Sequence, residues 1–262
     1  MKESTSITLI LVVLSLSSSS FEVAEGHKPL ETHGSNNNDF TNAKEIPDHR
    51  ISWAIYEEVS GSDNADYYKF TANKGERLYA QISIPKLEKF FTFTPSIAVV
   101  GSNLTASSLE RGYSVREYAH ESGDLPFTLP DGMRAIVVDY DGPIPSGEFY
   151  EPFTQTSYWE RQEIIINSLP SDGTYHLVVF DKGLMQEPAK YTLAIGEIED
   201  FSPIDFLTII PTAWFDTKLF FEDHVSPIIA ISLLILVSGI TLRVIINQFK
   251  GRRLGQSKAL GT

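Results

Sequence analysis

The chain of 262 residues contains no cysteine. No disulfide can therefore cross-link it, and no thiol can act as a nucleophile or metal ligand. Basic residues are also scarce, with 21 Lys and Arg against 34 Asp and Glu, which gives a formal net charge of -13. Because nucleic-acid phosphates are bound by Lys and Arg, this balance argues against a nucleic-acid-binding protein.

Recognisable catalytic motifs are also missing. The sequence contains no G-x-S-x-G nucleophile elbow, no H-E-x-x-H zinc helix, no phosphate-binding P-loop and no dinucleotide fingerprint. His120-Glu121 begins like a zinc-protease motif but lacks the second His at the required spacing. We therefore predict a protein that is not an enzyme and carries no cofactor, unless it binds copper as described below.

One long apolar run is present, from Val225 to Leu242, and it carries no charge. As an α-helix it would be roughly 27 Å long, close to the hydrocarbon thickness of a bilayer. Five basic residues and no acidic residue follow it: Arg243, Lys250, Arg252, Arg253 and Lys258. Because basic flanks stay on the cytoplasmic side, we predict a single transmembrane helix over 225–246 and a basic cytoplasmic tail over 247–262.

The N-terminus is typical of an export signal. Lys2 precedes a short apolar stretch over 7–16, and Ala24-Glu25-Gly26 is a plausible cleavage region. An uncleaved signal-anchor is the alternative, but the apolar stretch is too short to span a bilayer. We expect a signal peptide over 1–26, and a single-pass protein of the cell membrane whose ectodomain lies outside the cell.

The region between these segments is acidic and β-rich. Residues 27–225 carry 31 acidic and 15 basic residues, a net charge of -16. From residue 51 onward, about nine runs of alternating apolar and polar residues are separated by turns rich in Gly, Pro, Asn and Asp. This pattern predicts an all-β ectodomain, an antiparallel β-sandwich or jelly roll, over 51–200.

Two flanking segments complete the predicted domain organisation. Residues 27–50 are polar and rich in turn formers, as in an N-terminal linker. Residues 201–224 are interrupted by prolines and acids but contain several aromatic residues, which suits a segment at the bilayer interface. A strip that docks a partner helix is the alternative for this second segment.

Four of the predicted strands carry distinct motifs: Asp66-Tyr-Tyr-Lys-Phe, Gly75-Glu-Arg-Leu-Tyr-Ala-Gln-Ile, Gly173-Thr-Tyr-His-Leu-Val-Val-Phe and Lys190-Tyr-Thr-Leu-Ala-Ile. These motifs resemble the bacterial pre-peptidase C-terminal (PPC) domain. The resemblance covers 51–101 and 170–196, with a long insertion between them. It implies a small, non-catalytic β-sandwich accessory domain of exported proteins, often located beside a peptidase, although this chain contains no peptidase.

Aromatic residues are concentrated between residues 149 and 159. Tyr and Trp combine a large contact surface with a polar group, which suits a sugar or a protein interface. We therefore predict a partner-binding surface made by Phe149, Tyr150, Phe153, Tyr158 and Trp159. The alternative is that these rings cap one end of the sandwich core. The leading prediction is a membrane-anchored binding or assembly module that recognises a protein or a surface glycan.

Copper binding is the alternative function. Cleavage after Gly26 would leave His27 at the mature N-terminus, where the α-amine, its own imidazole and a second imidazole could bind copper. This arrangement resembles the histidine brace of exported copper proteins. The second ligand stays open among His33, His49, His120 and His176, and His33 is the nearest of these in sequence. A disordered juncture with two chance histidines is the competing interpretation.

A glycosylation sequon is present at Asn103-Leu104-Thr105. In an exported segment it predicts a surface loop that carries a glycan on Asn103.

Overall fold

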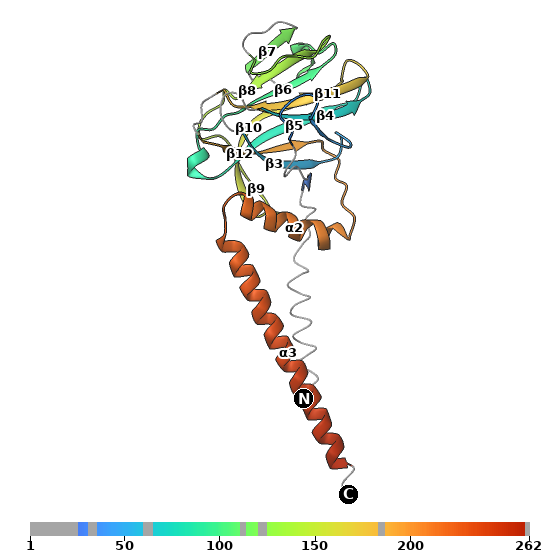
Figure 1. The fold of residues 1–262 in the computed structure, drawn as a ribbon, viewed down its shortest axis with the longest axis vertical. Helices are drawn as coiled ribbons and strands as arrows, with labels where there is room; N and C mark the ends of the chain where they lie inside the picture. Colours follow the sequence, from blue (N-terminus) through green and yellow to red (C-terminus); the bar gives the residue numbers. More distant parts are fainter. Residues whose placement is uncertain are drawn as a thin grey trace. The chain divides into compact units, whose positions relative to one another are not determined.

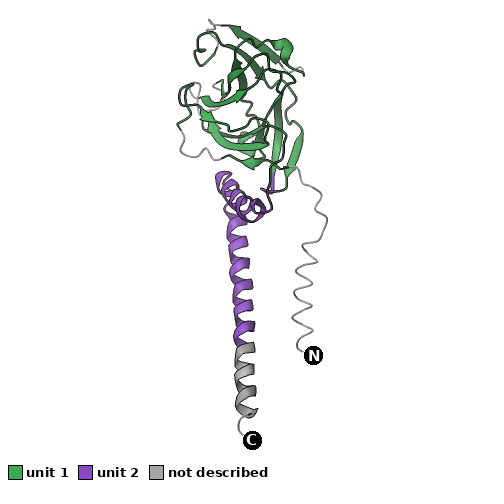
Figure 2. Cartoon of the chain, turned by 90° about the vertical axis from the view of Figure 1, so that its right-hand side faces the viewer, with its two compact units in different colours: residues 1–152, 157–201 green, residues 153–156, 202–262 purple. Residues whose placement is uncertain are grey.

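The computed structural model describes residues 26–30, 36–59, 65–110, 114–119, 125–182 and 187–259, and side chains as far as residue 247. The predicted signal region up to residue 25, His33 and His120 lie outside the described residues. The chain forms two compact units, which Figure 2 distinguishes by colour. The first comprises 1–152 with 157–201, and the second comprises 153–156 with 202–262.

The first unit is a sandwich of two six-stranded sheets (Figure 1). In spatial order, sheet A contains β1 Lys28–Pro29, β3 Trp53–Val59, β12 Ala189–Ile195, β5 Leu78–Pro85, β10 Thr156–Ile166 and β9 Glu148–Glu151. Sheet B contains β2 Lys44–Glu45, β4 Ala65–Ala72, β11 Gly173–Phe180, β6 Ser96–Gly101, β8 Arg134–Asp139 and β7 Ser114–Ala119. The predicted all-β sandwich is confirmed.

Most neighbouring strands are antiparallel, and only two short edge pairings, β1 with β3 and β2 with β4, are parallel among the described strands. Two short 3-10 helices, η1 Glu88–Phe90 and η2 Ala106–Ser108, lie on either side of β6.

The main core lies between the two sheets. On β5, Leu78, Ala80, Ile82 and Ile84 alternate with outward-facing residues and are fully buried, as the period-two pattern of that strand predicts. The same alternation on β11 buries Tyr175, Leu177 and Val179. At about 25 cal/mol per Å² of buried apolar surface, such side chains provide most of the stability of a domain without disulfides.

A second apolar cluster covers the opposite face of sheet B. Outward residues of β4, β6, β8 and β11 are buried here beneath side chains from the segments around residues 40 and 125–133. His176 belongs to this face, where its ring lies edge-on to Phe40 with the centroids 5.0 Å apart. Sheet B is therefore covered on both faces.

Two regions are more regular than the sequence analysis expected. The irregular region over 102–130 contains η2 and β7, whose charged outward residues weaken the alternation of a strand. The aromatic segment over 149–159 is a hairpin of β9 and β10. β10 runs to Ile166 and absorbs a register shift between Glu160 and Glu163.

The second unit contains two helices. The proline-interrupted segment expected at the interface forms α2, Asp205–Phe220, with Pro211 inside it. Within this unit, the Lys218 ammonium donates a 2.6 Å hydrogen bond to the Gln155 carbonyl, and Trp214 Nε1 donates to Gln155 Oε1 at 3.2 Å. These contacts join α2 to the turn over 153–156.

The C-terminal helix α3 runs from Val225 to Ala259 and is longer than predicted. Its residues Val225–Asn247 are apolar and long enough to cross a membrane. Asp223 accepts hydrogen bonds from the Ser226 amide and hydroxyl just before the helix, which lowers the pKa of its carboxyl and satisfies a helix N-terminal donor. One candidate membrane span is confirmed, while the orientation of the chain stays a prediction.

Candidate ligand-binding face of sheet A

A cavity of about 870 Å³ lies on the face of sheet A that points away from the core. Residues of β3, β5, β10 and β12 that alternate with core residues form its base, and residues of β9 and the two residues just before β1, Gly26 and His27, contribute at the sides. Figure 1 shows the strands of this sheet. All of its lining residues belong to the first unit. Such a volume falls within the range of small-molecule and cofactor sites.

The strand register explains why the sheet is hollow here. Two rows of outward side chains cross β3, β12, β5 and β10 in that order. The first row contains Tyr56, Thr192, Ser83 and Glu160, and the second contains Ala54, Ala194, Gln81 and Glu163. The middle of these rows is made of small residues, because Ala54, Ala194 and Ser83 meet there, each no more than 5% exposed. Side chains stand nearly perpendicular to a sheet, so short ones at the centre and long ones around them produce a depression.

Aromatic rings line part of this depression. Tyr56 and Tyr79 are half-buried, whereas Tyr150 on β9 is 57% exposed. Phe149 stacks on Tyr158 with the ring centroids 5.2 Å apart and the planes 17° apart. The cavity therefore offers both flat apolar surfaces and phenol groups.

The charge of the lining is one-sided. In the part of the chain that the structure describes, no lysine or arginine lines the cavity, whereas five glutamates do: Glu151, Glu160, Glu163, Glu197 and Glu199. Glu197 pairs with Arg77 beside the cavity, and Glu199 Oε1 accepts a 3.1 Å hydrogen bond from the Gly26 amide. In the described part of the chain, the Glu160 carboxylate forms no ion pair.

The base also contains a buried polar atom without a protein partner. Thr192 is 6% exposed, lines the cavity, and its Oγ1 receives no hydrogen bond from any described residue. Leaving such a group unsatisfied costs about 1–3 kcal/mol. A ligand that offers a hydrogen bond here would recover this free energy.

His27 lies at the same cavity. β1 pairs with β3, and the Lys28 amide donates a 2.8 Å hydrogen bond to the Ser52 carbonyl. This pairing places His27 Nδ1 2.5 Å from the hydroxyl of Ser52, which is itself 4% exposed. The residues directly after the predicted cleavage point are thus part of the sheet rather than of a linker.

The structure brings together some of the predicted site residues and separates others. Phe149, Tyr150 and Tyr158 line the same cavity as His27, although they are more than 120 positions away in the sequence. Trp159 is 5% exposed and packs in the core, edge-on to Phe91. A role of these aromatic residues in binding a partner stays a prediction.

Phe153 and Asn103 lie elsewhere. Phe153 belongs to the second unit, where its ring lies 6.2 Å from that of Phe206. Asn103 is exposed in the turn after β6 with a φ of 58°, a position open to glycan attachment.

Sequence reasoning missed Tyr56, Tyr79, Thr192 and the four glutamates outside the aromatic segment. No local signal distinguishes them, since each is an ordinary outward residue of its own strand or turn.

No group of three or more His, Asp or Glu side chains that could hold a metal ion is found among the described residues. His49 is buried and stacks on Phe70 at 4.7 Å, and burial is the main cause that lowers its pKa. The copper prediction therefore depends on His27; its second ligand stays open, and two of the candidates, His33 and His120, lie outside the described residues.

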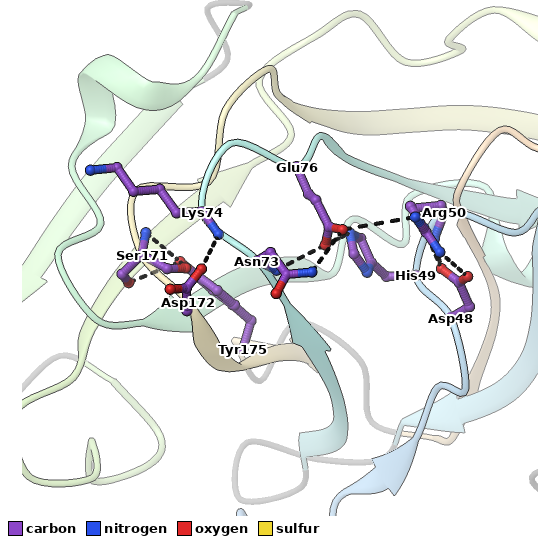
Figure 3. A network of polar contacts seen from close by, with 9 residues as sticks. All are labelled: Asp48, His49, Arg50, Asn73, Lys74, Glu76, Ser171, Asp172 and Tyr175. Atoms are coloured by element: carbon purple, nitrogen blue, oxygen red, sulfur yellow. Dashed lines mark hydrogen bonds and ion pairs between the residues drawn. The ribbon is translucent and has the colours of Figure 1, made fainter.

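A second polar cluster connects three turns (Figure 3). Glu76 lies 3.8 Å from both Arg50 and His49, and Arg50 donates to Asp48, whose pKa this hydrogen bond lowers to about 2. Nearby, the Lys74 amide donates a 2.6 Å hydrogen bond to Asp172. These contacts join the segment before β3 to the β4–β5 turn and the β10–β11 turn, which is a structural role.

Comparisons with known proteins place few constraints on this chain. No family model and no curated protein matches it. Among the solved structures that match is CorA, described as a surface-associated copper-binding protein important in Methylomicrobium album BG8 copper acquisition. The two are 10% identical, the match covers 60% of this chain and 98% of CorA, and the TM-score is 0.32. A score this low carries no functional argument, and the PPC resemblance stays a prediction.

Proposed function

We propose that this protein is a membrane-anchored, non-catalytic binding module whose ligand occupies the cavity on sheet A. The observation that carries this proposal is the depression of about 870 Å³, which the cross-strand register builds from small central residues. Sites on paired strands hold their geometry better than sites on loops. In this proposal, α3 anchors the module with the ectodomain outside and the basic tail in the cytoplasm.

Filling the cavity tests this proposal. Ala194 is 5% exposed at the centre of the base, so Ala194→Phe would occupy the space that a ligand needs. Ala119→Phe is the matched control, because it adds the same ring at an exposed position on β7 of the other sheet. Tyr158→Ala and Trp159→Ala are poor probes, since truncating buried aromatic side chains costs about 3–5 kcal/mol of stability.

The measurement is binding of the full-length protein, in nanodiscs, to an array that carries both oligosaccharides and peptides. We expect wild type and Ala119→Phe to bind the same array members, and Ala194→Phe to lose them while its melting temperature stays close to that of wild type. Equal binding by all three proteins would show that the ligand site lies elsewhere.

Copper binding is the second candidate function. The observation that favours it is that β1 fixes His27 beside Ser52, so an α-amine created by cleavage after Gly26 would be held on the sheet with its own imidazole. Preorganised nitrogen ligands suit copper. The test is intact mass and copper content of the protein from its native membrane. About one copper on a chain that begins at His27, lost in His27→Ala and kept in His224→Ala, would establish the site. A different N-terminus, or no metal, would exclude it.

A further inference from the structure

We propose that the ligand of the sheet A cavity is an organic cation, an alkylammonium or guanidinium group. A basic peptide segment or a small amine could supply this group. The inference rests on the proposed function and adds the chemical class of the ligand. Charge, hydrogen-bonding capacity and ring chemistry of the lining all point to this class.

The lining of the cavity is acidic. Among the described residues, five glutamates and no lysine or arginine line the cavity. Arg77, beside the cavity, pairs with Glu197. Like charges gathered around a depression focus a negative potential, which attracts cations and repels phosphates and carboxylates. An anionic ligand is therefore disfavoured.

The lining is also rich in hydrogen-bond acceptors. An ionised glutamate can only accept hydrogen bonds, and Glu160 has two oxygens that no described cation engages. The Thr192 hydroxyl is buried at the base and has no hydrogen-bond partner among the described residues, so it too can accept a hydrogen bond from a ligand. The matching ligand must supply several N–H donors, as an ammonium with three or a guanidinium with five does.

Aromatic rings lie in the same lining. Tyr56 and Tyr79 on neighbouring parts of the sheet and Tyr150 on β9 line the same depression as the carboxylates. The faces of aromatic rings attract ammonium and guanidinium groups, and Tyr also accepts hydrogen bonds through its hydroxyl. Rings combined with carboxylates therefore favour an organic cation.

The spacing of the carboxylates disfavours a metal ion. They come from β9, from two positions of β10 and from the segment after β12, and no three of the described acidic or histidine side chains converge to hold one ion. Separated charges along an open sheet face suit a ligand that carries positive groups at more than one point.

The experiment uses the full-length protein in nanodiscs of uncharged phosphatidylcholine. The probes are an end-blocked tetralysine peptide, the same peptide with every lysine acetylated, and 1,4-diaminobutane, with binding measured by calorimetry. We expect the tetralysine peptide to bind, its affinity to fall as salt rises, and the acetylated peptide to bind at least about tenfold more weakly. The diamine distinguishes a small-amine ligand from a peptide, because a small-amine site would bind it as tightly as tetralysine.

Charge-neutralising variants locate the interaction. Glu160→Gln combined with Glu163→Gln should weaken tetralysine binding about tenfold or more. The matched control is Glu45→Gln combined with Glu88→Gln, which removes the same charge from exposed positions outside the cavity. The control should leave binding nearly unchanged, and both double variants should melt near wild type.

The outcomes separate the two proposals. Equal weakening by both double variants would reduce the effect to overall charge and overturn the cationic-ligand inference. The cationic-ligand inference would also be overturned if the acetylated peptide bound as tightly as tetralysine, or if a neutral oligosaccharide did so. If Ala194→Phe abolished that binding, the cavity would still be the binding site. Binding that survives Ala194→Phe would instead overturn the proposed function.

Discussion

Replacing Asp66 with asparagine should stabilise the sandwich at pH 8 and change little below pH 4. Asp66 Oδ2 accepts a 2.6 Å hydrogen bond from the Tyr191 hydroxyl, whose oxygen lies 2.7 Å from that of the fully buried Tyr68. Burial, supported by the charges of Glu57 and Glu58, raises the pKa of Asp66 from 3.8 to about 7 against the opposing effect of this hydrogen bond. The fold therefore holds a carboxyl that it prefers protonated.

The magnitude follows from this pKa difference. A carboxyl with a higher pKa in the folded than in the unfolded chain binds its proton more tightly when folded, so stability falls as pH rises from about 4 to about 7. Each pKa unit corresponds to about 1.4 kcal/mol, which gives about 4 kcal/mol for Asp66 at pH 8. Because the residue retains some contact with solvent, we expect Asp66→Asn to gain about 2–4 kcal/mol there.

His176 produces the opposite dependence. Burial, and then the charge of Lys69, lowers the pKa of its imidazole from 6.5 to about 4, so stability rises over that pH interval by about 3 kcal/mol. His49, whose pKa is also lowered, acts in the same direction. In wild type these effects oppose that of Asp66. The stability of Asp66→Asn should therefore increase with pH. The stability of His176→Phe, which keeps a ring against Phe40, should decrease with pH.

The assay is urea unfolding of the purified chain in detergent micelles at intervals between pH 4 and 8, followed by the fluorescence of tryptophan, including the core residue Trp159. Asp200→Asn, at an exposed position, is the control and should reproduce the wild-type profile. Reduced stability of Asp66→Asn at pH 8, or the same pH slope in both variants, would refute this account of the buried carboxyl.

The remaining predictions concern packing, modification and anchoring. Gly101→Ala should destabilise the sandwich by about 1–3 kcal/mol in urea unfolding, because the added Cβ would overlap the buried ring of Tyr175. Adding Tyr175→Leu should recover part of this loss, whereas a double variant whose loss equals the sum of the two single losses would contradict the overlap as the cause. Protein from a glycosylating host should carry a glycan that disappears from the intact mass in Asn103→Gln. Alkaline carbonate should leave the full chain in the membrane pellet, whereas a chain ending at residue 224 should be released, since Val225–Asn247 is the candidate span.

Local pattern was sufficient for much of the fold. The alternation at Leu78, Ala80, Ile82 and Ile84 predicted a buried strand face, and the uncharged run from Val225 predicted the long helix. β7 and α2 were missed for physical reasons. β7 is a half-exposed strand with charged residues, and α2 contains Pro211, which ordinarily ends a helix.

The candidate site was only partly predictable. The aromatic composition near residue 150 led to Phe149, Tyr150 and Tyr158, and the N-terminal argument led to His27. The hollow itself depends on Ala54, Ala194 and Ser83, three small residues that become neighbours only through the order and register of β3, β12 and β5. Sheet order is a long-range property, so no local pattern shows which outward residues will share one face.

The short strands at the margins of the two sheets have a consequence for crowding. Each open margin presents charged residues or proline: Lys28 and Pro29 on β1, Lys44 and Glu45 on β2, Arg116 and Glu117 on β7, and Glu148 and Glu151 on β9. Charged or proline-containing edge strands resist pairing with the edges of other molecules. A membrane anchor confines copies to a plane and raises their local concentration, and these margins let the sandwiches stand side by side without joining into a continuous sheet.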